Sequence, residues 1–121
     1  MNIRRSPSSL CAEKVVYEAM LIMKEISSPV YYKTLIKLLP TRCSFTKWEL
    51  TTVGRLERPR WQVSLLFFVI HYCMAGFIVK NRGFWEITPC GITAIDNGAG
   101  YCYMMAEQAF KHWKKRKALS S

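Results

Sequence analysis

Acidic residues are scarce in this sequence, and their scarcity excludes several kinds of catalytic site. Eight Asp and Glu residues are spread over 121 positions, and Asp96 is the only aspartate. Metal-dependent nucleases need several carboxylates that converge on one site. The sequence also lacks a glycine-rich phosphate loop, a GxSxG nucleophile elbow and an HExxH zinc motif. We therefore expect no catalytic constellation, and the chain is predicted not to be an enzyme by itself.

Metal-binding patterns are missing as well. None of the cysteines forms a CxxC pair; they are Cys11, Cys43, Cys73, Cys90 and Cys102. Zinc ligands normally come in pairs two to four residues apart. His71 and Cys73 are close in sequence, but residues two apart on a helix point in different directions. We expect reduced thiols, as in an intracellular compartment, and no metal or other cofactor.

Positive charge is abundant where negative charge is scarce. Eighteen Lys and Arg residues give the chain a formal net charge of +10. Such an excess favours a polyanionic partner, either nucleic acid or an anionic membrane surface. The alternative is a basic protein that has no such partner.

One long stretch has no charge at all. The 19 residues from Trp61 to Val79 contain no Lys, Arg, Asp or Glu, and this length just suffices to span a bilayer. Polar residues and a glycine interrupt the stretch at Gln62, Ser64, His71 and Gly76. A buried helix followed by a strand explains the stretch better than a membrane span, and we expect no membrane partner.

Helix caps, turn residues and apolar periodicity predict the order of the elements. Helices are expected at 10–26 (capped by Ser8 or Ser9), 33–39 (ended by Pro40), 47–53 (ended by Gly54), 59–75 (ended by Gly76), 89–96 and 101–117. Extended segments are expected at 30–32, 77–80 and 84–88, with a loose arm at 1–8 that holds Arg4, Arg5 and Pro7, and a basic loop at 54–60. Apolar residues at helical spacing, Val15, Ala19, Ile22 and Ile26, form the expected inner face of the first helix.

Three of these boundaries rest on specific signals. Thr46 and Glu49 fit a capping box, with Phe45 and Leu50 in the positions of a hydrophobic staple. The segment Asn81-Arg82-Gly83 is typical of a tight hairpin turn. Thr88-Pro89 fits the cap and first turn of a helix, and Pro59 fits the first position of the long helix.

This order predicts a mainly α fold with a small β-hairpin wing, that is, a winged helix-turn-helix with an additional C-terminal helix. The winged-helix DNA-binding domain is expected over 1–98. Residues 99–121 are expected to form a basic C-terminal helix or linker, which ends in Lys114-Lys115-Arg116-Lys117. That run is a weak signal for nucleic-acid binding, and it also complements the negative end of the helix dipole.

The long helix at 59–75 carries the candidate base-reading residues. Four residues fall on one stripe at about 100° per residue: Arg60, Ser64, Phe67 and His71. If this helix docks in the major groove, Arg60 and Ser64 face base edges, since Arg pairs with guanine and Ser is less selective. The alternative is a solvated face. Phe67 touches the methyl group of thymine or 5-methylcytosine, packs on a partner domain, or packs against the C-terminal helix.

Two further groups of residues are candidates for contact with the DNA backbone. The hairpin tip carries Lys80, Asn81 and Arg82, which suit phosphates or the minor groove. Arg55, Arg58 and Arg60 precede the long helix and are expected to form a phosphate clamp beside its N-terminus. A charged turn and a solvated basic loop are the alternatives.

About a third of the chain, from Arg58 to Ala94, resembles the N-terminal winged-helix domain of Mrr-type restriction endonucleases. The matching segments are Arg58-Pro59-Arg60-Trp61, Ala75-Gly76-Phe77-Ile78, Arg82-Gly83-Phe84-Trp85-Glu86-Ile87-Thr88-Pro89 and Gly91. In that family the winged helix recognises DNA, and a separate C-terminal nuclease domain cuts it.

The resemblance implies a target-recognition domain that senses modified cytosine, with Trp61 in the core and Arg60 on double-stranded DNA. It also implies a cytoplasmic, nucleoid-associated prokaryotic protein, which is either the recognition domain of a longer parent protein with a nuclease domain or a stand-alone reader.

Two other functions stay open. The first is a protein-interaction module that uses its hydrophobic stripe and last helix to form a homodimer, without direct DNA readout. The second is a small membrane-associated basic protein built around residues 61–79. Salt-sensitive affinity for DNA separates the DNA-binding hypothesis from the interaction module, because phosphate contacts release counterions. Solubility without detergent would exclude the membrane-associated protein.

Overall fold

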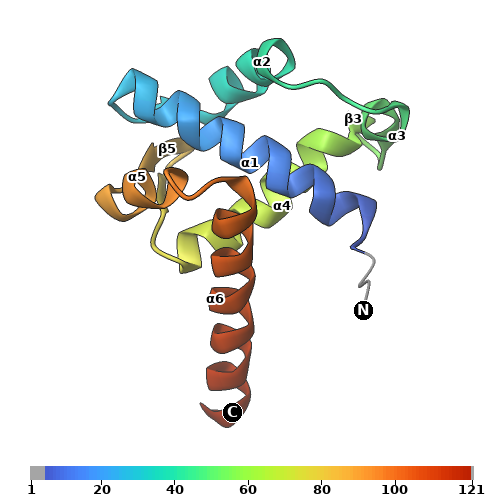
Figure 1. Ribbon diagram of the computed structural model, residues 1–121. Helices are drawn as coiled ribbons and strands as arrows, with labels where there is room; N and C mark the ends of the chain where they lie inside the picture. The colour runs from blue at the N-terminus through green and yellow to red at the C-terminus, as the bar shows by residue number, and fades with distance from the viewer. Residues whose placement is uncertain (1–4, 121) are drawn as a thin grey trace.

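The computed structural model describes residues 5–120, which form a small, mainly helical domain with two small antiparallel sheets (Figure 1). The helices are α1 (Pro7–Ile26), α2 (Tyr32–Arg42), α3 (Lys47–Leu50), α4 (Arg60–Met74), α5 (Pro89–Ile95) and α6 (Ala99–Ser120). The strands are β1 (Val30–Tyr31), β2 (Thr52–Val53), β3 (Arg58–Pro59), β4 (Ile78–Asn81) and β5 (Phe84–Ile87).

Helix α1 crosses α4 and α6 and forms the centre of the core (Figure 1). Its predicted inner face is confirmed for Val15, Ala19 and Ile22, which are buried. The prediction is wrong for Ile26, which is 42% exposed because it is the last residue of the helix.

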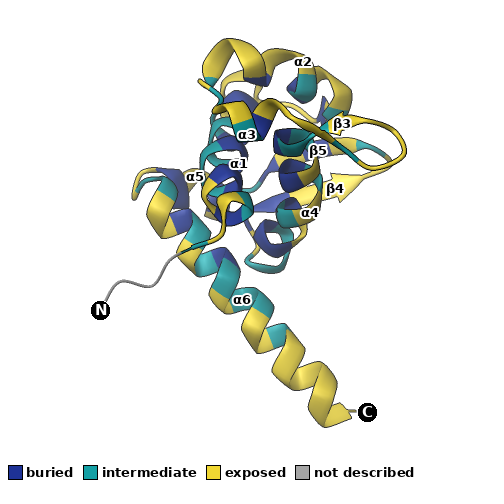
Figure 2. Ribbon diagram, turned by 90° about the vertical axis from the view of Figure 1, so that its right-hand side faces the viewer, coloured by how far each residue is buried: buried dark blue, intermediate teal, exposed yellow. Residues whose placement is uncertain are grey.

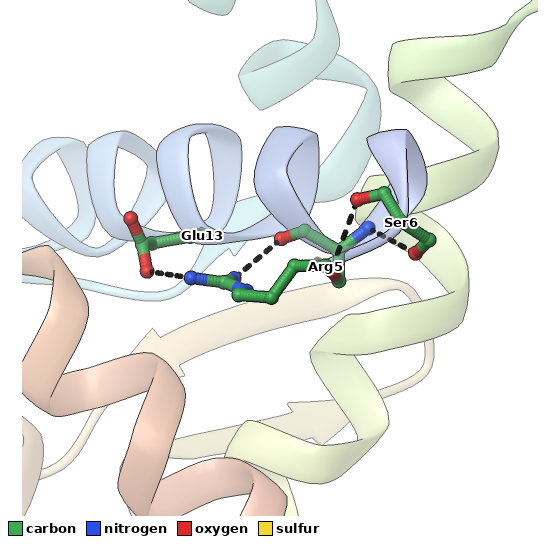
Figure 3. Close-up of polar contacts among 4 residues, drawn as sticks. Arg5, Ser6 and Glu13 are labelled. Carbon is green, nitrogen blue, oxygen red and sulfur yellow. Dashed lines mark hydrogen bonds and ion pairs between the residues drawn. The ribbon is translucent and has the colours of Figure 1, made fainter. Parts of the chain in front are cut away.

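The start of α1 corrects two predictions. The cap is Ser6, whose hydroxyl accepts the backbone N–H of Ser9, so neither Ser8 nor Ser9 caps the helix. Arg5 is also tied down, since it donates to the Glu13 carboxylate at 2.6 Å and to the Ser9 carbonyl at 3.0 Å (Figure 3). The predicted loose arm is therefore wrong for residues 5–8, while residues 1–4, with Arg4, lie outside the described part of the chain.

Helix α2 does not end at Pro40, as the sequence predicted, but continues to Arg42. A proline in the last turn removes only one helical hydrogen bond, and the carbonyls of a last turn are largely unpaired in any case. Arg42 then anchors this end on α1, with ion pairs to Glu18 at 3.4 Å and to Glu25 at 2.7 Å. These tertiary contacts offset the local cost of the proline.

The capping box of α3 is present as predicted: Thr46 Oγ1 accepts from the Glu49 N–H at 3.2 Å, and the Thr46 N–H donates to Glu49 Oε1 at 2.9 Å. The predicted staple is not formed, because Leu50 is 56% exposed and Phe45 stacks on Trp61 with ring centroids 4.8 Å apart. The helix is also shorter than the expected 47–53, since the following residues pair as the hairpin β2–β3.

Helix α4 begins at Arg60, one residue later than predicted, because Pro59 belongs to β3 and pairs with Thr52. Trp61 is buried, as the resemblance implied. The uncharged stretch is divided into this helix, a turn at Gly76 and strand β4. Within residues 5–120, no helix combines the length and the apolar composition needed to cross a membrane.

A three-stranded sheet in the order β1-β5-β4 joins the ends of the helices. Val30 pairs with Trp85, and Lys80 pairs with Trp85 from the other side. The predicted hairpin is confirmed; its two turn residues, Arg82 and Gly83, have φ angles of 52° and 86°. Positive φ at both positions is the geometry of the type I′ turn that two-residue hairpins favour.

For the last two helices, the predicted cap of α5 is confirmed, whereas the predicted bounds of α6 are too narrow. The Thr88 cap of α5 is confirmed, since its hydroxyl accepts the Gly91 N–H at 3.0 Å. Helix α6 is longer than the predicted 101–117. Its first half contributes Cys102 and Ala106 to the same core as α1 and α4, whereas its second half stands away from the body in both views (Figures 1 and 2).

Candidate nucleic-acid interface

A basic groove lies where α2, β3 and the first turns of α4 meet. Its volume is about 320 Å³, and it is lined by Tyr32, Lys33, Ile36, Lys37, Arg58, Gln62 and Leu66. Lys33 and Lys37 are four residues apart on α2 and therefore share one face of that helix. The opposite face buries Leu35 and Leu39, so packing of the core turns both lysines outward.

Arg58 reaches the groove from β3, where it pairs with Val53. Gln62 is half-buried in the first turn of α4 and supplies the amide of the groove. An amide of this kind pairs bidentately with adenine, and lysine and arginine side chains bind phosphate oxygens. The groove thus combines cations for a sugar-phosphate backbone with one group that can read a base.

No carboxylate among the described residues forms an ion pair with Lys33, Lys37 or Arg58. Five of the acidic residues are paired elsewhere: Glu13 with Arg5, Glu49 with Lys14, Glu18 and Glu25 with Arg42, and Glu107 with His71. Three cations with no carboxylate partner in residues 5–120 consequently face one hollow, and their mutual repulsion is relieved when an anion binds.

The predicted clamp of Arg55, Arg58 and Arg60 is divided by the structure. Arg60 Nε donates to Thr51 Oγ1 at 3.0 Å, and its guanidinium lies 4.9 Å from the centroid of the Trp48 ring. Arg58 lines the groove, and Arg55 is exposed in the β2–β3 turn. Arg60 is therefore half-buried against Trp48 of α3 and Thr51, the residue that follows α3.

Two of the predicted base-reading residues are buried. Ser64 is 4% exposed, and His71 is 5% exposed. The His71 ring stacks on Phe110 of α6 at 3.9 Å between centroids, so α6 covers the end of the stripe. Neither residue is accessible to a base edge in this fold. The helical periodicity gave the wrong exposure because it describes one helix without the elements that pack against it.

Burial also shifts the pKa of His71. Removal from water lowers the pKa of the imidazole below its ordinary value, and Glu107, whose Oε1 lies 3.3 Å from Nδ1, acts in the opposite direction but is outweighed. The contact lies within ion-pair distance, and Nδ1 has no hydrogen-bond partner among the described residues. His71 is thus part of the α4–α6 interface.

Phe67 is 60% exposed, and its ring contacts are with Phe68 and His71 of its own helix. The predicted packing against the C-terminal helix is therefore wrong for this residue. Val63 and Ile70 are also exposed, so the outer face of α4 beyond Arg60 is an apolar stripe. An apolar stripe matches methyl groups or another protein, and it has no donors or acceptors for base edges.

The hairpin β4–β5 presents the remaining predicted residues. Lys80, Asn81 and Arg82 are all exposed, and the Lys80 ammonium lies 5.4 Å from the centroid of the Trp85 ring. The Tyr32 N–H donates to the Gly83 carbonyl at 2.8 Å, and Tyr32 also lines the groove. The tip of the β4–β5 hairpin therefore lies beside the groove, at the start of α2.

Within residues 5–120, no group of three or more His, Cys, Asp and Glu side chains is placed to hold a metal ion. Burial raises the pKa of the Cys11 thiol to about 12 and that of Cys102 to about 11. Thiolates, which act as nucleophiles and metal ligands, are disfavoured at both positions.

Sequence reasoning missed Lys33, Lys37 and Gln62. The four-residue spacing of the two lysines within a predicted helix was a visible signal, because such a pair always shares a helix face. The position of that face against α4 was not visible, because it depends on how the two helices pack. No protein-family model, curated protein or solved structure matched this chain, and its resemblance to the Mrr-type winged helix stays a prediction.

Proposed function

We propose that this chain is a winged-helix domain that binds double-stranded DNA through the groove between α2 and α4. One observation carries the proposal: Lys33, Lys37 and Arg58 converge on one hollow without carboxylate partners among the described residues. Phosphate contacts of this kind supply much of the affinity of DNA-binding proteins.

The order of the elements supports the same proposal. Helix α1, strand β1, helices α2 and α4, and the hairpin β4–β5 follow the sequence of a winged helix. In this arrangement the first turn of α4 approaches the major groove, with Gln62 at the base edges and the wing residues Lys80 and Arg82 on the backbone. Ser64 and His71 take no part, because they are buried.

The family context is part of the proposal. The segments from Arg58 to Ala94 that resemble Mrr-type enzymes suggest the target-recognition part of a modification-dependent restriction system. The exposed Phe67 ring offers an apolar surface to a 5-methyl group. Duplexes that differ only in 5-methylcytosine test this point, and a preference that Phe67→Ala removes is expected.

Fluorescence anisotropy with a labelled duplex over a salt series tests DNA binding. The variant Lys33→Ala/Lys37→Ala is expected to weaken binding and to reduce the slope of log K against log salt by about 0.9 for each phosphate that the variant no longer neutralises. Lys24→Ala/Lys47→Ala is the matched control, because both lysines are exposed and lie outside the lining of the groove. Equal weakening of binding in the two variants, or no binding by the wild-type chain at low salt, contradicts the proposal.

The apolar stripe of α4 favours a second candidate function, a protein-interaction or dimerisation module. Val63, Phe67 and Ile70 follow the 4-3 spacing of a helix that packs on another helix, and all three are exposed. Sedimentation velocity tests self-association over a concentration series. Phe67→Ser is expected to lower the mass of any dimer, and Leu56→Ser, a change of an exposed loop residue, is expected to leave it unchanged.

A further inference from the structure

The outer half of α6 is the most strongly charged segment of the chain. Five basic residues occupy seven positions: Lys111, Lys114, Lys115, Arg116 and Lys117. All five are exposed, and none has an ion-pair partner among residues 5–120. The nearest carboxylate along the helix, Glu107, is turned towards His71. No acidic residue follows Glu107 in the sequence, so this charge is not neutralised within the segment.

Repulsion between these cations disfavours the helical conformation of the segment that carries them. Lys111 and Lys115 are four residues apart, and Lys114 and Lys117 are three apart, so like charges are neighbours on the helix surface. The Lys114 ammonium lies 5.2 Å from the Phe110 ring centroid, and that of Lys117 lies 4.9 Å from the Trp113 ring centroid. The rings hold these two cations in place without neutralising them, and a bound polyanion would relieve the repulsion.

The place of this segment in the fold indicates which polyanion it meets. The exposed half of α6 projects from the body in both views (Figures 1 and 2). A helix of 22 residues is about 33 Å long. Lys33 and Lys37 of the groove belong to α2, and in both views α2 lies at the top of the molecule and the end of α6 at the bottom, so an anion that contacts both must be long (Figures 1 and 2).

We infer that the basic end of α6 is a second contact site for the sugar-phosphate backbone of the duplex that occupies the groove. This inference rests on the proposed function. Two separated contacts on one duplex act as linked sites, so the second adds affinity only when the duplex is long enough to span both.

The experiment compares two duplexes in the anisotropy assay: a GC-rich hairpin of about 10 base pairs, roughly 34 Å long, and a duplex of about 30 base pairs, roughly 100 Å long. Lys111→Gln/Lys114→Gln/Lys115→Gln is expected to weaken binding of the long duplex by on the order of tenfold and to change binding of the short one much less. The charge-conserving variant Lys111→Arg/Lys114→Arg/Lys115→Arg is the matched control and is expected to bind both duplexes as the wild type does.

The outcomes separate this inference from the proposed function. Unchanged binding of the long duplex, or equal weakening on both, overturns the inference, while weaker binding of both duplexes by Lys33→Ala/Lys37→Ala still supports the groove. Weaker binding only in the α6 variant supports a contact by α6 and contradicts the groove. Weaker binding to anionic phospholipid vesicles, with unchanged binding of the long duplex, assigns the helix end to a membrane surface and likewise overturns the inference.

Discussion

Gly91 of α5 lies against the backbone of Phe77, the residue just before β4. A Cβ atom there would overlap the Phe77 carbonyl oxygen and lie 2.7 Å from Cγ1 of Ile87. Backbone atoms cannot move aside as a flexible side chain can, so Gly91→Ala is expected to destabilise the fold by about 1–3 kcal/mol. Urea unfolding followed by circular dichroism measures this change.

Gly100→Ala is the matched control for this prediction. Gly100 also lies in a helix, and a Cβ atom there has only the Glu13 side chain within 4 Å, at an ordinary contact distance of 3.9 Å. Alanine favours the helix by up to about 1 kcal/mol over glycine, so this variant is expected to be as stable as the wild type or more stable. Equal destabilisation of both variants would show that the close approach at Gly91 is not the cause.

Glu49 is a buried carboxylate whose stability contribution depends on pH. Burial alone would raise its pKa, but hydrogen bonds from Lys14 at 2.7 Å and from the Thr46 N–H at 2.9 Å outweigh burial, and the pKa is lowered. A carboxylate with a lowered pKa in the folded state stabilises the fold above its unfolded pKa, and this contribution is lost as the pH falls through the folded value.

Glu49→Gln is therefore expected to lower stability near neutral pH and to flatten its decline below about pH 4.5. Chemical denaturation at pH 7, 5, 4 and 3 provides the measurement. Glu25→Gln removes a more exposed carboxylate and is expected to change the pH profile less. A Glu49→Gln profile parallel to that of the wild type would contradict the assigned role.

At the scale of the elements, Thr88 connects the end of α4, the β4–β5 hairpin and α5. Its hydroxyl accepts the Gly91 N–H at 3.0 Å and lies 2.6 Å from the Gly76 carbonyl, to which it donates. Removal of a helix N-cap costs about 0.5–2 kcal/mol, so Thr88→Ala is expected to lower the free energy of unfolding by about that amount. Thr93→Ala, which removes an exposed hydroxyl within the same helix, serves as the control in thermal melts and is expected to cost less.

The boundaries of the elements show where local signals suffice. The Thr88 cap, the Thr46 capping box and the Arg82-Gly83 turn were predicted because each depends on residues within four positions of one another. The prediction that α2 ends at Pro40 was wrong because Arg42 pairs with residues of α1 that are distant in sequence. The predicted end of α3 at residue 53 was wrong because β2, which begins at Thr52, pairs with β3.

At the scale of the whole molecule, the fold sorts the thiols by exposure. Cys90 is exposed, whereas Cys11 and Cys102 are buried and Cys43 and Cys73 are half-buried. Burial raises the pKa of the Cys43 thiol to about 11 and also raises that of Cys73. Thiol reagents attack the thiolate, so these four cysteines are expected to react slowly in the folded protein.

A colorimetric thiol assay at neutral pH is consequently expected to find one fast thiol per chain in buffer and five in denaturant. Cys90→Ser should abolish the fast phase and leave four thiols that react only after unfolding. More than one fast thiol in the wild-type chain would mean that the core around α1 opens more readily than its packing implies.

The sequence alone determined the basic character of the chain, the main helices and the hairpin. These properties follow from composition, from periodicity and from hydrogen bonds between near neighbours, none of which needs the rest of the fold. Only the tertiary structure decided which polar residues are accessible. It buried Ser64 and His71, held Arg60 against Trp48 and brought Lys33, Lys37 and Arg58 to one groove, because the exposure of a helix face depends on the elements that pack against it.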